Sequence, residues 1–84
     1  MDTRVIKYFL TVAQTNNITH AAQQLHITQP PLSRQMSDLE KELGVTLFDR
    51  KQRRMALTSE GVLFQQRAST ILSLLDQTKQ ELQN

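Results

Sequence analysis

A glutamine, a serine and an arginine at positions 29, 33 and 34 form the most specific polar pattern in this chain of 84 residues. Positions four residues apart lie on one face of a helix, and Ser37 continues that face. The side chains of glutamine and arginine can each form two hydrogen bonds with the edge of a purine base in the major groove of DNA. A helix that presents Gln29, Ser33 and Arg34 together is therefore predicted to contact base pairs.

A helix over residues 29–43 must position these side chains. Thr28 is expected to cap it, and Pro30 and Pro31 fall in the first turn, where N–H groups have no helical partner anyway. Gly44 is suited to end the helix in a left-handed conformation. The face opposite the polar residues is apolar, with steps of four, three and four residues: Leu32, Met36, Leu39 and Leu43.

The cluster Arg50-Lys51-Gln52-Arg53-Arg54 is a second candidate for contact with nucleic acid. Residues 1–49 contain four basic and five acidic side chains, whereas residues 50–84 contain six basic and three acidic ones. The net charge of the whole chain, +2, indicates little by itself, but a concentrated basic segment suits DNA phosphates. The alternative is a solubilising loop.

Apolar residues alternate with other residues on both sides of the basic cluster. Val45 and Leu47 precede it, and Met55 and Leu57 follow it. Alternation is typical of strands with one buried face, so a β-hairpin wing with a basic loop is expected. The loop lacks the Asn-Gly or Asp-Gly pair that marks a tight hairpin turn, and the register of the strands stays open.

The first helix is expected to run from Asp2 to about Thr15 and to be mainly structural. Asp2 complements the positive end of the helix. Asn16-Asn17 ends it, because asparagine tolerates the left-handed conformation. The apolar residues of this segment follow helical spacing: Val5, Ile6, Phe9, Leu10, Val12 and Ala13.

A second, short helix is expected from an N-cap at Thr19 to about Leu25. Its inner residues Ala21 and Ala22 are small, which would let a crossing helix approach closely. The short turn over residues 26–28 then leads into the helix that carries the polar pattern. Two helices joined by a tight turn are typical of a helix-turn-helix.

A long final helix is expected to begin at Thr58-Ser59-Glu60, where Thr58 can cap it and Glu60 complements the positive helix end. The helix has too much apolar surface for three short helices to cover. We expect the same helix of a second chain to cover it, in either orientation; the alternative is an intramolecular core. One set of its residues follows the heptad pattern of paired helices: Phe64, Ala68, Ile71, Leu75, Thr78 and Leu82.

Catalytic and metal chemistry have little support in this sequence. There is no cysteine, and the two histidines, His20 and His26, are not accompanied by clustered carboxylates. No nucleophile is placed beside a base, and the only two glycines, Gly44 and Gly61, cannot make a glycine-rich phosphate loop. We therefore expect neither an enzyme nor a metal or cofactor in this chain. No stretch is apolar enough to suggest a membrane span.

Three stretches of the chain resemble the N-terminal DNA-binding domain of LysR-type transcriptional regulators. They are THAAQQL at 19–25, TQPPLSRQM at 28–36 and LGVTLFDR at 43–50, the last continuing through Arg53 to LTSEG at 57–61. Their order and spacing, together with the apolar first helix, extend the resemblance over essentially the whole chain.

The resemblance implies a mainly α fold, in which three helices and a short β-hairpin form a winged helix-turn-helix over residues 1–57. A linker helix over residues 58–84 would pair antiparallel with its copy to form a homodimer. The resemblance further implies a cytoplasmic bacterial regulator whose larger C-terminal portion binds a small-molecule effector. Without that portion the chain looks like an excised domain, and whether the complete regulator is a tetramer stays open.

The resemblance also implies which residues contact DNA. The family's base-contacting positions fall on Gln29, Pro30, Ser33 and Arg34. Its contacts with the DNA backbone or minor groove fall on Thr28, Pro31, Gln35, Arg50 and Arg53, with Arg54 as an extra candidate. The sequence departs from the commonest pattern at three positions: Asn16 for glycine, Ile18 for an aromatic residue and Pro31 for alanine. Pro31 removes one N–H directed at phosphate and can change the preferred operator.

The predicted function is sequence-specific binding of a homodimer to an inverted-repeat operator in double-stranded DNA. The alternative is a protein-interaction module that keeps the helix-turn-helix shape without base readout. Weak, sequence-blind DNA binding would favour the alternative.

Overall fold

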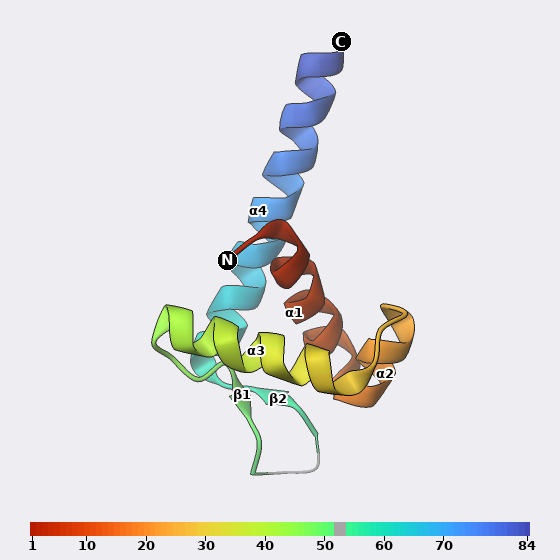
Figure 1. The fold of residues 1–84 in the computed structure, drawn as a ribbon. Helices are drawn as coiled ribbons and strands as arrows, with labels where there is room; N and C mark the ends of the chain where they lie inside the picture. Colours follow the sequence, from red (N-terminus) through yellow and green to blue (C-terminus); the bar gives the residue numbers. More distant parts are fainter. Residues whose placement is uncertain (52–53) are drawn as a thin grey trace.

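The computed structural model describes residues 1–51 and 54–84 (Figure 1). The elements within these residues are α1 (Thr3–Thr15), α2 (Ile18–Gln24), α3 (Gln29–Leu43), β1 (Phe48–Asp49), β2 (Ala56–Leu57) and α4 (Ser59–Gln83). The three shorter helices and the hairpin pack together, while α4 packs on α1 and then extends away from them (Figure 1). This arrangement confirms the predicted winged helix-turn-helix followed by a long helix.

Polar side chains define both ends of α1. The Asp2 carboxylate accepts a hydrogen bond from the Val5 N–H (2.9 Å), which satisfies one of the N–H groups left free at the helix start. At the other end, Asn16 adopts the left-handed conformation (φ 53°), and its N–H donates to the Val12 carbonyl. Asn16 thus takes the place that glycine has at many helix ends, as the sequence indicated.

The cap of α2 differs from the prediction: Thr19 does not cap the helix. The cap is Asn17, whose side-chain oxygen accepts a hydrogen bond from the His20 N–H (3.0 Å). Asparagine and threonine are both good N-caps, so the choice depends on where the chain leaves α1. α2 ends at Gln24, and His26, in the left-handed conformation (φ 58°), turns the chain toward α3.

Phe9 lies at the centre of the core. Its ring centroid is 5.4 Å from that of Phe48 and 4.7 Å from that of Phe64, the second in an edge-to-face arrangement. Phe9 therefore joins α1 to both the wing and α4. The buried residues around it come from the faces that the sequence marked as apolar: Ile6, Val12, Ala13, Ala21, Ala22, Leu32, Met36 and Leu39.

The wing is shorter than the alternation of apolar residues predicted. β1 and β2 pair antiparallel, with Phe48 opposite Leu57. Val45, Leu47 and Met55, expected in the strands, lie outside them, and Val45 is exposed. The alternation fails because Leu47 and Phe48 are consecutive and both are buried, whereas successive residues of a regular strand point to opposite faces.

The first turn of α4 is fixed to the base of the wing. The Thr58 hydroxyl accepts a hydrogen bond from the Gly61 N–H (3.0 Å) and donates one to the Thr46 carbonyl (2.6 Å). The Thr58 N–H donates to the Leu47 carbonyl (3.0 Å). A Cβ atom at Gly61 would overlap that same Leu47 carbonyl oxygen. Glycine is therefore required here for close approach, not for backbone conformation.

The inner half of α4, residues 59–72, and its outer half, residues 73–83, have different surroundings. Ala68 is completely buried, and Phe64 is half-buried against Phe9. A side chain with no exposed surface cannot contact a second chain, so assigning Ala68 to the dimer seam is wrong, and Phe64 also belongs to the core. The other four members of the predicted seam are exposed: Ile71, Leu75, Thr78 and Leu82.

Candidate nucleic-acid interface

The N-terminal end of α3 carries the predicted base-contacting residues. Pro30 and Arg34 are exposed, and Gln29 and Ser33 are half-buried beside them. The Gln29 amide nitrogen donates a hydrogen bond to the Ser33 hydroxyl (2.6 Å), a contact open to residues four apart on a helix. The structure therefore brings these four residues together at one end of α3.

The start of α3 has few backbone N–H groups to offer. Thr28 is the N-cap, but among the described residues its side chain makes no capping hydrogen bond. Pro30 and Pro31 lack N–H groups, so two of the four that a helix start normally leaves unpaired are missing. The two prolines cost the helix no hydrogen bond, but they reduce the number of N–H groups that the helix start can donate to a phosphate.

Gln35 lies on a different edge of α3 from Gln29 and Ser33. It lines a hollow with Asp2 and Asp38, on the side that faces the start of α1. Its side-chain oxygen is buried and accepts no hydrogen bond from the described residues. A contact of Gln35 with the DNA backbone would therefore depend on its amide nitrogen.

Glu40 connects α3 to the wing. One carboxylate oxygen accepts hydrogen bonds from the N–H groups of Leu47 (2.7 Å) and Phe48 (3.2 Å), and the other accepts one from the Arg50 guanidinium (2.8 Å). The side chain of Glu40 is only 12% exposed, so salt screens this ion pair less than it screens a pair at the surface. The carboxylate therefore fixes the position of the wing relative to α3.

Arg50 makes a structural contact besides its predicted contact with DNA. Its guanidinium pairs with Glu40 and lies 5.9 Å from the centre of the Phe48 ring, within the range of a cation–π interaction. An arginine has five N–H donors, and 43% of this side chain is exposed. Arg50 thus retains donors for a phosphate while it supports the wing.

The residue before β2 is hydrogen-bonded to the corner between α1 and α2. The Met55 N–H donates to the Asn16 carbonyl (3.1 Å). Lys51 and Arg54 are exposed near the wing tip, whereas Arg53, also predicted to contact DNA, lies outside the described residues. The wing lies beside α3, at the end of the molecule opposite the C-terminus (Figure 1). The wing is therefore attached at Glu40, near the C-terminal end of α3, whereas the predicted base-contacting residues lie at the start of that helix.

Sequence reasoning missed Glu40. Its backbone partners are seven and eight residues further along the chain, and they come within reach only after the chain turns at Gly44 (φ 72°). The available signal was an acidic residue on the flank of the helix, with Arg50 ten residues later. Such a pair is too common in sequences to identify a contact.

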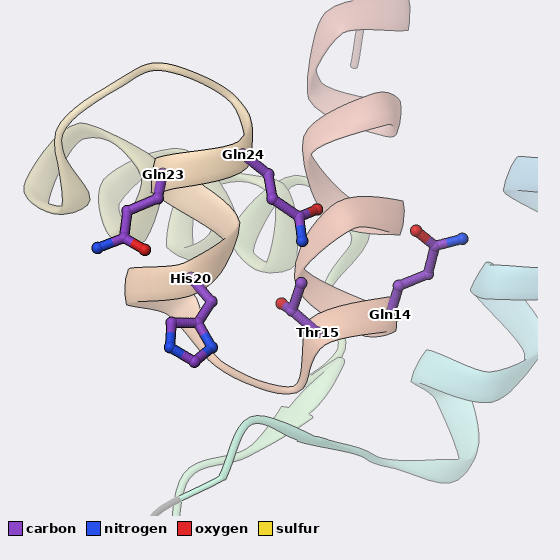
Figure 2. A pocket seen from close by; sticks show the side chains of 5 residues that line it. All are labelled: Gln14, Thr15, His20, Gln23 and Gln24. Atoms are coloured by element: carbon purple, nitrogen blue, oxygen red, sulfur yellow. The ribbon is translucent and has the colours of Figure 1, made fainter.

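A shallow hollow between the end of α1 and α2 is the other polar feature of note (Figure 2). It is lined by Gln14, Thr15, His20, Gln23 and Gln24. The Gln14 amide points away from the His20 ring, so the polar groups do not converge on one point (Figure 2). Within residues 1–51 and 54–84, no cluster of histidine, cysteine and carboxylate side chains could hold a metal ion. No helix in these residues is long and apolar enough to cross a membrane.

The family model described as "Bacterial regulatory helix-turn-helix protein, lysR family" matches residues 3–62. The chain belongs to the LysR family. The match includes α1, α2, α3 and the wing, and it ends one turn into α4. The LysR-family match therefore contains every residue predicted to contact DNA.

Curated relatives of this LysR-family chain are transcriptional regulators. The HTH-type transcriptional regulator BsdA of Bacillus subtilis (strain 168) is 52% identical over 84 residues, which cover 99% of this chain. The HTH-type transcriptional regulator BenM of Acinetobacter baylyi is 46% identical over 77 residues, or 92% of this chain. The chain spans only 29% and 25% of the lengths of these two relatives.

Solved structures share the fold over its full length, α4 included. The DNA-binding domain of CbnR in a complex with DNA superposes with a TM-score of 0.94 and 41% identity, covering 99% of this chain and 95% of that one. The DNA-binding domain of BenM in a complex with benA site 1 DNA gives a TM-score of 0.94 and 42% identity, covering 99% and 93%.

Proposed function

We propose that this LysR-family domain binds double-stranded DNA sequence-specifically, as a homodimer, and is the DNA-binding domain of a bacterial transcriptional regulator. One observation carries the proposal. The start of α3 carries Gln29, Ser33 and Arg34, and Glu40, further along the same helix, fixes a basic wing to it. The CbnR and BenM domains, which have the same fold, are in complexes with DNA, and this supports the proposal.

In this proposal α3 is the recognition helix and enters the major groove. Arg34 suits guanine and Gln29 suits adenine, because each side chain can match two groups on that base. Pro30 and Ser33 complete the base-contacting surface. To contacts with the DNA backbone or minor groove we assign Thr28, Pro31 and Gln35 of α3, Arg50 and Arg54 of the wing, and Arg53, which lies outside the described residues.

The partner that best fits the exposed face of α4 is the same helix of a second chain. Ile71 is 41% exposed, Leu75 36% and Leu82 81%, and a heptad seam of such residues is the pattern by which helices pair. An antiparallel pair of α4 helices would relate the two domains by a two-fold axis. The two recognition helices would then face the halves of an inverted-repeat operator.

The relatives are more than three times as long as the chain, and we assign the remaining functions of such a regulator to the part beyond it. A small-molecule effector would bind there, and that part would also decide whether the complete protein is a tetramer. The domain itself would need no cofactor and catalyse no reaction. Its action on chromosomal DNA would place it in the cytoplasm.

Selection from random duplex DNA at moderate salt tests the proposal. The expected result is an inverted repeat whose half-site centres lie about one helical turn, roughly 34 Å, apart. That outcome would establish base readout and dimer geometry together. Tight binding only at low salt, without enrichment of any sequence, would contradict the proposal and favour the protein-interaction module.

Arg34→Ala gives a sharper test of base readout. We expect it to cost about 1–3 kcal/mol of binding free energy on the selected site and to relax the base preference at one position. Lys41→Ala is a matched control, because Lys41 is an exposed cation two turns along the same helix. An equal loss of affinity for every DNA sequence would reassign Arg34 to the DNA backbone.

A further inference from the structure

The hydrogen bond between Gln29 and Ser33 joins two residues that are each expected to contact bases. The Gln29 amide nitrogen lies 2.6 Å from the Ser33 hydroxyl oxygen. Both side chains are half-buried, whereas Pro30 and Arg34, which flank them, are exposed. Ser33 is therefore less accessible than Pro30 and Arg34, and its hydroxyl oxygen already accepts a hydrogen bond from Gln29 of the same helix.

The amide of Gln29 retains the groups that an adenine requires. A glutamine amide has two N–H donors and one carbonyl acceptor. After one N–H is given to Ser33, one donor and the acceptor remain. Adenine presents the complementary pair in the major groove, an acceptor at N7 and a donor at N6. The contact with Ser33 is thus compatible with complete readout of one adenine.

The same hydrogen bond limits the freedom of the Gln29 side chain before any DNA arrives. Glutamine is among the side chains that lose most rotamer freedom when they are fixed, and fixing it in advance removes that cost from binding. The backbone beneath it is also restricted, because Pro30 and Pro31 have fixed φ angles. The start of α3 therefore holds Gln29 at both its backbone and its amide.

We propose that Ser33 acts through Gln29: its hydroxyl holds the Gln29 amide in the orientation that reads an adenine, so that the two residues specify one base pair as a unit. This inference rests on the proposed function of the domain. It makes Ser33 a positioning residue for Gln29 and leaves Arg34 as an independent reader of a different base pair.

A double-mutant cycle with site selection tests this unit. The variants are Gln29→Ala, Ser33→Ala and the double variant, each measured on the selected site and on the same site with the adenine pair replaced. Gln29→Ala should reduce the preference for adenine by roughly 5- to 150-fold. Ser33→Ala should reduce the preference at the same base pair by about two- to tenfold. In the Gln29→Ala background, Ser33→Ala should have no further effect.

Two controls separate positioning from loss of structure. Ser33→Thr keeps the hydroxyl and should restore the adenine preference. Ser37→Ala removes a half-buried serine one turn further along α3 and should leave that preference unchanged. Alanine is favoured in helices, so thermal unfolding of the Ser33→Ala variant should show that it folds.

The outcomes distinguish this inference from the proposed function beneath it. If the wild-type domain selects no site, the proposed function fails and the unit fails with it. The wild-type domain could select a site while Ser33→Ala alters the preference at a different base pair, or has an effect that adds fully to that of Gln29→Ala. Either outcome would make Ser33 an independent reader of a base and would overturn only the proposal that Gln29 and Ser33 act as a unit. Selection of a base other than adenine at the Gln29 position would overturn the orientation assigned to the amide.

Discussion

The inner half of α4 lies against the domain, whereas its outer half extends beyond it (Figure 1). Where the inner half contacts other elements most closely, its residues are small: Gly61 touches the backbone of Leu47, and Ala68 is completely buried. In the outer half, every residue from Ser73 onward is exposed, and Leu74 and Leu82 are the two most exposed large apolar side chains of the described residues.

This difference shows how one helix can serve two kinds of contact. Contact within the chain combines the packing of Phe64 on Phe9 with close approach at the small residues Gly61 and Ala68. Contact with a second chain requires side chains that project from the single chain and lose water only when the partner arrives. Substitutions at the buried residues of the inner half should therefore change the stability of the domain, and substitutions at the exposed residues of the seam, from Ile71 outward, should change its association.

Gly61→Ala should have the largest effect on stability. The new Cβ atom would overlap the Leu47 carbonyl oxygen, so the backbone would have to move at a point that also holds Thr58. We expect a loss of about 3 kcal/mol, which corresponds to a fall in Tm of roughly 12–24 °C. Thermal unfolding at one protein concentration would measure it.

Gly44→Ala is the matched control for this substitution. Gly44 has a positive φ of 72°, but a Cβ atom there would meet nothing within 4 Å. Its cost should therefore be conformational strain alone, about 1–2 kcal/mol. Equal losses of stability at the two glycines would mean that the packing of α4 against Leu47 is looser than the structure indicates.

Leu75→Asp should leave the fold intact and weaken the dimer. Leu75 is already 36% exposed in the single chain, and its remaining surface would be buried only by a partner. Each Leu75 would lose about 1 kcal/mol of apolar burial, so the two copies in the dimer together lose about 2 kcal/mol, which raises the Kd of the dimer about thirtyfold. Sedimentation equilibrium would measure the Kd, with Ser73→Asp, an exposed residue outside the heptad seam, as the control. An unchanged dimer would place the interface elsewhere.

Glu60 should make the smallest contribution, through pH. The Ser59 hydroxyl donates to its carboxylate (2.8 Å) and a backbone N–H adds to this, so the pKa of Glu60 is lowered. A group with a lowered pKa stabilises the fold above its unfolded pKa, and this contribution disappears as the pH falls through the folded value. Wild type and Glu60→Gln should therefore differ slightly in Tm at pH 6 and converge as the pH falls through the lowered pKa of the Glu60 carboxyl. A constant difference would exclude a role for the charge.

The helices could be predicted from the sequence because their signals are local. The apolar spacing in α3, the glycine at 44 and the asparagine at 16 each act within one or two turns, and the structure confirms all three. The clustering of Gln29, Ser33 and Arg34 follows from the same spacing. Whether these residues contact bases stays a prediction, which the selection experiment tests.

The features that sequence reasoning missed depend on contacts between distant parts of the chain. Ala68 and Leu75 occupy the same heptad pattern, yet the first is buried in the domain and the second is exposed beyond it. Glu40 became significant only after Leu47 and Phe48 folded back onto it. No spacing rule separates these cases before the fold is known.

The register in which two α4 helices pair would determine how many base pairs separate the two half-sites. Sliding one helix of the proposed antiparallel pair by one heptad would change the distance between the two domains by about 10 Å. That shift equals about three base pairs along the duplex, and it would also rotate the second half-site by roughly 100° around the DNA axis. A slipped dimer could still be a stable dimer, but its two recognition helices would no longer meet the same side of the operator. The pairing register of the heptad seam would thus set the spacing between the two half-sites and the side of the duplex that each one faces.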